Sequence, residues 1–336
     1  MTPLTEAIPD QPGSRMTPAE YGASRAGLWT AAGVLVTDRD GRVLVQHVDY
    51  RDTLLLPGGA VDAGESPSTA AAREMDEELG VETRPTRGLV VDWIPANTPG
   101  FEPEMRFPGE IVYVFDGGTW SPERIASVRL PAQEITGIRF VEPGDLARVM
   151  EAGDARRVLA ALRARVEGQA PTLLERGRPA EPGALDRLGV LCAPRPREHG
   201  AWRTGPVPQD LAVRDTRCWL LAPDGRALAL VDREHGTVSL PTPEQVPPGH
   251  VDGPLAPLGH LHDENAPWLH LRTVGRLGPG ATAPGGRYAA LLATPEQIRE
   301  LTDWGPDGPA QIAAVHEARR LRGLPEPLRG PVTELA

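Results

Sequence analysis

Residues 59–81 carry the most informative pattern in this chain. They read Gly-Ala-Val-Asp-Ala-Gly-Glu-Ser-Pro-Ser-Thr-Ala-Ala-Ala-Arg-Glu-Met-Asp-Glu-Glu-Leu-Gly-Val. Ser66-Pro67 is typical of a helix N-cap and first turn, and Gly80 is typical of a left-handed helix end. The preceding run Leu54-Leu-Leu-Pro57 predicts a strand, and Gly58-Gly59 predicts a tight turn after it. The segment therefore predicts a strand, a loop and a helix in succession.

The expected helix carries three glutamates on one side. Glu74, Glu77 and Glu78 are three and four residues apart, and like charges at this spacing repel by roughly 0.2–0.5 kcal/mol per pair. On the helix, Arg73 is placed to offset part of this repulsion. A hard divalent cation such as Mg²⁺ would offset more, because it prefers oxygen ligands and holds phosphate oxygens at the same time. The alternative is a solvated acidic helix face, which is what most charge runs are.

The whole segment resembles the Nudix box, Gly-x5-Glu-x7-Arg-Glu-U-x-Glu-Glu-x-Gly-U, in which U is aliphatic. A chance match of its seven fixed residues has odds on the order of 10⁻⁶ in a chain of this length. The matching residues are Gly59, Glu65, Arg73, Glu74, Glu77, Glu78 and Gly80. The resemblance favours the metal-binding interpretation and implies an α/β fold, a Nudix-type α/β/α sandwich with a mixed sheet.

The same resemblance implies the metal ligands. Glu74 and Glu78 would be the main ligands, and the carbonyl of Gly59 would complete the coordination. Glu77 would be a ligand of a second ion or the base that activates water. The implied cofactor is Mg²⁺, with Mn²⁺ as an alternative.

Three further residues receive roles through the resemblance. Glu65 and Arg73 would brace the helix against its loop. Many family members add one more acid from a later segment, which serves as a base. Glu110 is the first candidate for that acid in this chain, with Glu102 and Glu104 as alternatives.

The implied reaction is the Mg²⁺-dependent hydrolysis of the diphosphate linkage in a nucleoside diphosphate joined to another moiety. ADP-ribose or a nucleotide sugar is the first candidate substrate, because Pro95 resembles a proline of ADP-ribose-hydrolysing members. One alternative is a nucleoside triphosphate pyrophosphohydrolase acting on damaged nucleotides. Another is a nucleotide-sensing or scaffold protein that uses its second domain.

Residues 95–109 form a Pro/Gly-rich stretch between two expected strands, and this stretch is long enough to be a functional loop. Within it, Phe101 is a candidate to stack on a base and Arg106 to neutralise phosphate. The alternative is an insertion without a recognition role.

The composition narrows the class of protein and its partners. The chain has 336 residues and a formal net charge of −11, and all 35 of its basic residues are arginine. This charge argues against nonspecific binding to nucleic acid or anionic membranes. No apolar run approaches ~18 residues, and there are only two cysteines, so we expect a soluble cytoplasmic protein. The partner that the resemblance implies is a small-molecule nucleotide substrate. A homodimer is compatible with these observations.

The chain is long enough for two domains. We expect a disordered tail at 1–23, a catalytic domain at 24–168, a Pro/Arg/Gly-rich linker at 169–212, a second smaller α+β domain at 213–325 and a tail at 326–336. In the first domain, strands are expected at 31–37, 43–48, 88–94, 110–116 and 134–141, and helices after residues 143 and 155.

Short segments of the second half are similar in sequence to segments of the first half. Residues 216–231 and 237–241 align without gaps on 32–47 and 53–57 at an offset of 184, and residues 288–292 align on 136–140 at an offset of 152. The second copy has Thr242-Pro243 where the first has Gly58-Gly59, and no Arg-Glu-x-x-Glu-Glu follows. This pattern predicts a degenerate Nudix-like domain without a box. The alternative is an unrelated β-rich domain.

Overall fold

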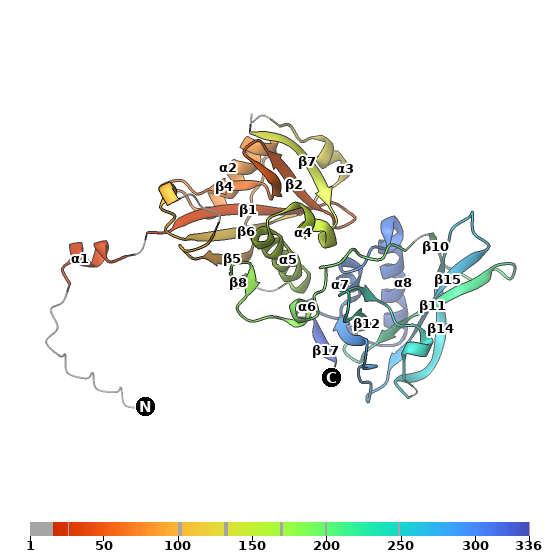
Figure 1. The fold of residues 1–336 in the computed structure, drawn as a ribbon. Helices are drawn as coiled ribbons and strands as arrows, with labels where there is room; N and C mark the ends of the chain where they lie inside the picture. The colour runs from red at the N-terminus through yellow and green to blue at the C-terminus, as the bar shows by residue number, and fades with distance from the viewer. Residues whose placement is uncertain are drawn as a thin grey trace, which may run out of the picture.

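The computed structural model describes residues 16–25, 27–99, 103–130, 134–168, 171–198, 200–247 and 249–335. Two mixed sheets follow one another along the chain, and helices pack against each of them (Figure 1). In the described chain no helix is long and apolar enough to cross a membrane.

The first sheet contains the six expected strands and three short additions, β4, β8 and β9. Its order is β3-β2-β1-β6-β5-β8-β9, with β4 paired to β1 and β7 paired to β2. β1 lies parallel to β6 and antiparallel to β4, so the sheet is mixed, as predicted. The strands are β1 (Trp29–Thr37), β2 (Val43–Val48), β3 (Arg51–Leu55), β4 (Gly58–Ala60), β5 (Gly88–Ile94), β6 (Glu110–Thr119), β7 (Ile135–Val141), β8 (Thr172–Glu175) and β9 (Arg178–Pro179).

Helices cover both faces of this sheet. α2 (Pro67–Leu79) packs on one face, where Val34 and Val36 of β1 meet Ala71 and Met75. Leu35 points to the opposite face because side chains alternate along a strand, and there it joins a core that includes α5 (Ala152–Glu167). The predicted α/β/α sandwich is confirmed. The other helical pieces of this half are α1 (Pro18–Ala23), η1 (Pro103–Met105), α3 (Pro122–Ala126), η2 (Pro143–Asp145) and α4 (Leu146–Val149).

The second half is an α+β unit, as predicted. Its sheet has the order β10-β14-β15-β11-β12-β16-β17, with β13 paired to β12. The strands are β10 (Ala201–Arg203), β11 (Ala212–Leu221), β12 (Ala227–Asp232), β13 (Val238–Ser239), β14 (Val251–His262), β15 (Trp268–Leu277), β16 (Tyr288–Ala293) and β17 (Thr333–Leu335). The helical pieces are η3 (Pro243–Gln245), α7 (Pro295–Glu300), η4 (Gly305–Asp307) and α8 (Gly308–Leu321), and α6 (Ala184–Arg187) precedes this sheet.

The two sheets share a strand plan and a register. Thr37 pairs with Val43 between β1 and β2, and Leu221 pairs with Ala227, each 184 residues later. β2 meets β7 at Val43↔Val141, and β12 meets β16 at Ala227↔Ala293, where the later partner lies 152 residues on. β1–β6 and β11–β15 are both parallel pairs. A duplicated fold would produce this agreement, although the repeat itself stays a prediction.

The domain boundaries also stay predictions, but the expected linker and tails contain regular structure. β8 and β9 extend the first sheet past residue 168, and Leu185 and Val190 are fully buried. β17 adds backbone hydrogen bonds to β16 within the expected C-terminal tail. Thr17 and Glu20 form a capping box that starts α1 within the expected N-terminal tail. These elements are too short to leave a periodic pattern in the sequence.

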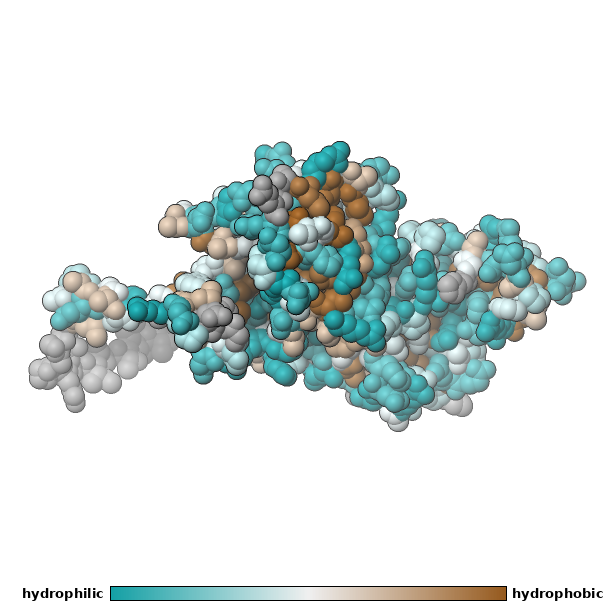
Figure 2. All heavy atoms as spheres, turned by 45° about the horizontal axis from the view of Figure 1, so that its top comes forward, coloured by the Kyte–Doolittle hydropathy of each residue, from teal (hydrophilic) through white to brown (hydrophobic). Residues whose placement is uncertain are grey.

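One hydrophobic core reaches from α5 into the second half. It contains Leu162 of α5, Leu185 of α6, Ile298 of α7 and Trp304. Polar contacts cross the same boundary, including a 3.0 Å hydrogen bond from Gln297 Nε2 to the carbonyl of Val166. Figure 2 shows that hydrophobic surface gathers mainly on the first half in this view, while the second half is largely hydrophilic.

Candidate active site

Local sequence explains why the box helix forms where it does. Ser66 accepts a hydrogen bond from the backbone N–H of Thr69 at 3.2 Å, and Pro67 occupies the first turn. Gly80 ends α2 in the left-handed conformation, with φ 62°. Ala70, Ala71, Met75 and Leu79 are buried against the sheet. The remaining faces of α2 carry the glutamates.

The box carboxylates are held by two sets of partners. Arg73 Nη1 donates to Glu74 at 2.8 Å and to Glu77 at 2.9 Å, and Arg73 Nη2 donates to Glu65 at 3.1 Å. These bonds join the loop acid to the helix acids, and the predicted bracing role of Glu65 and Arg73 stays a prediction. Bonds between the acids and Arg73 raise the pKa of the guanidinium, that to Glu65 most of all, so Arg73 stays charged.

Glu78 points toward the sheet. It accepts hydrogen bonds from the backbone N–H of Gly58 at 2.8 Å and from Gln46 Nε2 at 2.6 Å. Burial raises the pKa of the Glu78 carboxyl to about 7 despite these donors, and burial also raises the pKa of Glu74 against the effect of Arg73. The site therefore holds two acids whose negative charge is costly without a further cation.

The Gly58-Gly59 turn brings the backbone against these acids. β4 pairs with β1 at Gly33↔Gly58 and Ala32↔Gly59. A Cβ on Gly59 would lie 2.6 Å from Glu74 Oε1, so only glycine lets this carboxylate approach the backbone so closely. The turn thus lies between the two predicted metal ligands on α2 and the central strand.

The donor set fits a hard divalent cation. Glu74, Glu77, Glu78 and the carbonyl of Gly59 offer oxygen atoms only, the kind of ligand that Mg²⁺ and Mn²⁺ prefer. In the structure these carboxylates are divided between Arg73 and the Gly58–Gln46 pair. In the part of the chain described, one group of three potential ligands lies within 4.8 Å, namely Asp232, Glu234 and His235. Asp232 is already paired with Arg287 there, so we assign no metal to that group.

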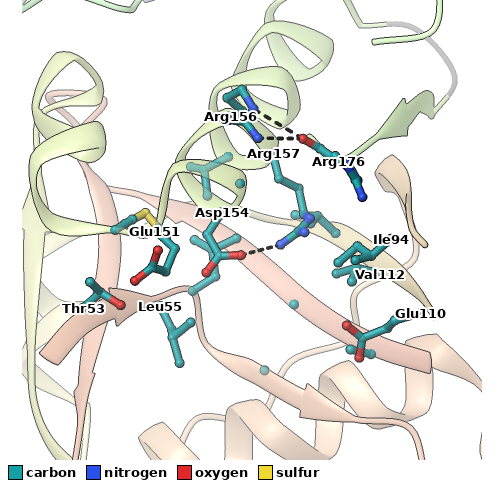
Figure 3. Close-up of a pocket in the computed structure, with 18 of the residues that line it drawn as sticks. Thr53, Leu55, Ile94, Glu110, Val112, Glu151, Asp154, Arg156, Arg157 and Arg176 are labelled. Carbon is teal, nitrogen blue, oxygen red and sulfur yellow. Dashed lines mark hydrogen bonds and ion pairs between the residues drawn. The ribbon is translucent and has the colours of Figure 1, made fainter. Parts of the chain in front are cut away.

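A cavity of about 1070 Å³ opens beside the glycine turn (Figure 3). Gly58 and Gly59 belong to its wall, together with apolar side chains of β3, β5 and β6. Leu55, Ile94 and Val112 are examples of these apolar side chains. A cavity of this size with a partly apolar wall is typical of a small-molecule site.

Glu110 lies at the start of β6 and lines this cavity, at the end away from Glu151 in Figure 3. Burial raises the pKa of its carboxyl, and Arg157 opposes that shift. Its assignment as a base stays a prediction. Phe101 lies outside the described residues. Arg106 is exposed with φ 47° and is not among the residues that line the cavity, so its predicted phosphate contact also stays untested.

Arginines of α5 and of the β8–β9 turn line the cavity wall beyond β6. Arg157 pairs with Asp92 at 2.8 Å and with Asp154 at 2.7 Å. Arg156 donates to the carbonyl of Arg176 at 3.0 Å, as Figure 3 shows. Neither Arg156 nor Arg176 has a carboxylate within ion-pair distance in the described chain. The wall therefore presents two positive charges that an anionic ligand can meet.

Sequence reasoning missed these residues and Gln46. Gln46 and Asp92 are polar residues at fully buried positions of otherwise apolar strands. A polar residue within an apolar run could have marked both positions as candidates in the sequence. Arg51, Arg156, Arg157 and Arg176 left no signal, because arginines on a helix face or in a turn are usually solvated. They meet at the cavity only through the fold.

Replacement of Arg157 by methionine is expected to destabilise the fold by about 3–5 kcal/mol, because it removes one partner of a buried ion pair. The side chain of Asp92 has no exposed surface. Without Arg157, its buried negative charge would have no cationic partner and would accept hydrogen bonds from the backbone N–H of Gly177. The double variant Asp92→Leu/Arg157→Met should recover much of the loss, because it removes both charges. Urea unfolding of the two variants tests this expectation, and equal losses would argue against a coupled pair.

Comparison with known proteins places this site in a family. The NUDIX domain family matches residues 27–162. A Nudix hydrolase of Rhodococcus erythropolis, orf19, which is described as uncharacterized, is 31% identical over 127 residues that span 30% of this chain and 68% of that relative.

Shorter matches involve two kinds of named enzyme. An RNA pyrophosphohydrolase of Rhodospirillum rubrum is 36% identical over 68 residues, 20% of this chain and 41% of that protein. An 8-oxo-dGTP diphosphatase of Haemophilus influenzae is 41% identical over 54 residues, 15% of this chain and 40% of that protein. The chain spans about half the length of the RNA pyrophosphohydrolases that it matches, between 41% and 53% in three of them. The matched residues include β1 to β7, the box helix and most of the cavity wall. Because the match to the Rhodococcus relative is 31% identical and covers two thirds of that protein, the chain belongs to the Nudix hydrolase family.

Proposed function

We propose that the first half is a divalent-metal-dependent pyrophosphohydrolase of nucleoside diphosphates linked to a second moiety, with ADP-ribose or a nucleotide sugar as the first candidates. The observation that carries this proposal is the position of the box. Glu78 and the Gly58-Gly59 turn meet at the edge of a cavity whose far wall carries arginines. The box glutamates are not among the lining residues of this cavity, so a diphosphate bound there would reach them beside the Gly58-Gly59 turn while it meets the arginines on the far wall.

In this proposal the box acids hold the metal, and the cavity holds the substrate. Glu74, Glu78 and the carbonyl of Gly59 are the ligands, with Glu77 as a ligand of a second ion or as the base. Bound Mg²⁺ or Mn²⁺ would neutralise charge on a phosphoryl oxygen and promote activation of water. Glu77 or Glu110 takes the proton of the attacking water. A new P–O bond forms with the water oxygen, the bridging P–O bond breaks, and the leaving phosphate retains the bridging oxygen.

The size and walls of the cavity support a substrate with a second moiety. About 1070 Å³ exceeds the needs of a diphosphate alone, and the apolar wall suits a base or sugar ring. Arg156 and Arg176 lie on the opposite wall from Thr53 in Figure 3, so they would meet anionic or hydroxyl groups at one end of the ligand.

A nucleoside triphosphate is the second candidate substrate. The 8-oxo-dGTP diphosphatase match favours it, since that relative is named for a nucleoside triphosphate. Both reactions would use the same box residues, and they differ in the products.

Product analysis separates the candidates. The full chain would be incubated with ADP-ribose, nucleotide sugars and nucleoside triphosphates, with Mg²⁺ or Mn²⁺, and the products resolved by chromatography. A nucleoside monophosphate plus a sugar phosphate supports the proposal, and a nucleoside monophosphate plus pyrophosphate supports the second candidate. Absence of turnover with every nucleotide would favour a sensing or scaffold role instead.

Loss of both unpaired arginines should weaken substrate binding more than catalysis. The variant Arg156→Ala/Arg176→Ala is expected to raise KM about 10²–10⁴-fold, because each of the two charged hydrogen bonds contributes about 1.5–3 kcal/mol when it is made. The value of kcat should change less, since neither residue lies at the box. Steady-state kinetics with the best substrate provide the measurement.

Arg84→Ala is a suitable control, because Arg84 is exposed, pairs with Glu82 and does not line the cavity. Equal KM values for the double variant and this control would exclude the arginine wall from recognition.

A further inference from the structure

The second half contains a cavity of its own, about 830 Å³ in volume. It lies at the position in the second sheet that the first cavity occupies in the first sheet. Five of its lining residues follow lining residues of the first cavity by 184 positions: Asp215, Arg217, Thr237, Ser239 and Thr242 correspond to Ala31, Gly33, Thr53, Leu55 and Gly58. The strand registers give the same offset, so the correspondence comes from the structure as well as from the sequence.

The box is missing at this second position. Thr242 stands where Gly58 makes the turn, and η3 is the one helical piece between β13 and β14 in the described residues. The second half has no Arg-Glu-x-x-Glu-Glu sequence. Asp232 lines the cavity, but its carboxylate accepts hydrogen bonds from Arg287 Nε at 2.9 Å and from the backbone N–H of Glu234 at 3.0 Å. The carboxylate set that would drive hydrolysis in the first half therefore has no counterpart here.

One arginine of this cavity takes the place of a small residue of the first site, and a second is buried beside it. Arg217, which replaces Gly33, pairs with Asp215 at 3.2 Å. Arg272 is almost completely buried and pairs with Glu198, while its Nε has no hydrogen-bond partner in the described chain. A buried donor without a partner costs about 1–3 kcal/mol, and an acceptor on a ligand would remove that cost. Arg272 thus points to a ligand with acceptor oxygens.

Another part of the cavity lining combines a cation with aromatic rings. The guanidinium of Arg214 lies 4.8 Å above the ring of Trp268 and has no carboxylate partner in the described part of the chain. Tyr288 and Trp304 also line the cavity. Planar rings and arginines together suit a ligand that carries both a flat ring and an anionic group.

The acidic residues that line this cavity do not rule out an anionic ligand. Glu198, Asp215 and Asp232 are each paired with an arginine, namely Arg272, Arg217 and Arg287. Asp263 is the fourth acid of the wall, and Arg197, which pairs with Asp303, is the fourth arginine. Formal charges on the wall balance in a protein of net charge −11, so this cavity is far less acidic than the chain as a whole.

We propose that this second cavity is a binding site for a nucleotide-class ligand, a phosphorylated molecule with a planar ring, which the protein holds without hydrolysing it. The phosphate oxygens would meet Arg214, Arg217 and Arg272, and the ring would stack against Trp268. The chain would then contain one catalytic site and one binding site built on the same strand plan.

Calorimetric titration of the full chain with ADP in the presence of EDTA tests the binding. The affinity for ADP is expected to be unchanged in Arg156→Ala/Arg176→Ala. It should fall about tenfold in Arg214→Ala and in Trp268→Leu, which is the loss typical of one stacking or charged contact. Arg320→Ala is the matched control, because Arg320 is an exposed arginine of α8 outside the cavity. Arg214 is exposed, so its variant keeps the test valid even if Trp268→Leu folds poorly.

Absence of ADP binding at millimolar concentration, or an affinity that neither Arg214→Ala nor Trp268→Leu changes, would overturn the proposal. The fate of the ligand is tested with Mg²⁺ and the full-length Glu78→Gln variant, in which ADP should remain intact. Hydrolysis of ADP by that variant, abolished by Arg214→Ala, would show a second catalytic site instead. Binding is measured without turnover, so it is informative even if the first half hydrolyses none of the substrates proposed above.

Discussion

Replacement of Glu78 by glutamine is expected to lower kcat by about 10³-fold, the upper part of the range for removing one stabilising group from an active site. Glu78 is the box acid that faces the sheet, and its hydrogen bonds join the helix to Gly58 and Gln46. As a metal ligand it would supply a full negative charge, which a neutral amide cannot replace. Steady-state kinetics with saturating Mg²⁺ measure the change.

Stability should change by less than about 1 kcal/mol in the same variant. The amide oxygen keeps one of the two hydrogen bonds, and the cost of burying a carboxylate whose pKa is raised to about 7 disappears. Glu82→Gln is the control, since Glu82 is an exposed acid just beyond the end of α2. Wild-type turnover in Glu78→Gln would contradict the assignment of Glu78 as a metal ligand.

The box and its surroundings were predictable because each part depends on local chemistry. The Ser66 cap, the Pro67 first turn and the Gly80 end are set by residues within one turn of the helix termini, and the structure confirms all three. The strands at 43–48 and 88–94 match β2 and β5 because their apolar runs are bounded by turn residues. Local signals of this kind survive without any knowledge of tertiary contacts.

The cavity was not predictable in the same way. Arg157 meets Asp92 across 65 positions of sequence, and Arg51 meets Asp154 across 103. No local pattern marks such a pair, because its geometry exists only after β5 and α5 have packed. Glu110 was proposed through the family resemblance and lines the cavity, although its role stays a prediction, whereas the arginines beside it were not predicted.

The repeat was only partly predictable from the sequence. A constant offset of 184 was visible in short identities, and the same offset appears in the ladders of β1–β2 and β11–β12. The core that joins the halves was not visible, since Leu185, Val190 and Leu191 are scattered through a segment rich in proline, arginine and glycine. Composition described that segment correctly but did not reveal which few side chains are buried.

Replacement of Gly58 by alanine is expected to destabilise the fold by about 3–5 kcal/mol, because backbone strain and a steric clash add together. Gly58 has φ 139°, in the region that favours glycine. A Cβ there would lie 2.2 Å from the carbonyl oxygen of Ala32 and 2.6 Å from Cα of Gly33. Both atoms belong to the backbone of β1, which cannot move without breaking its ladders to β4 and β6. Urea unfolding measures the loss.

Gly64→Ala separates the two contributions in this prediction. Gly64 also has a positive φ, 83°, but a Cβ at that position would meet nothing within 4 Å. Its substitution should therefore cost only the backbone strain, about 1–2 kcal/mol. Activity should fall with Gly58→Ala even in the folded fraction, because the N–H of Gly58 would no longer reach Glu78. Similar losses of stability in the two variants would show that β1 accommodates the extra methyl group, and the glycine turn would then not be required for close approach to the sheet.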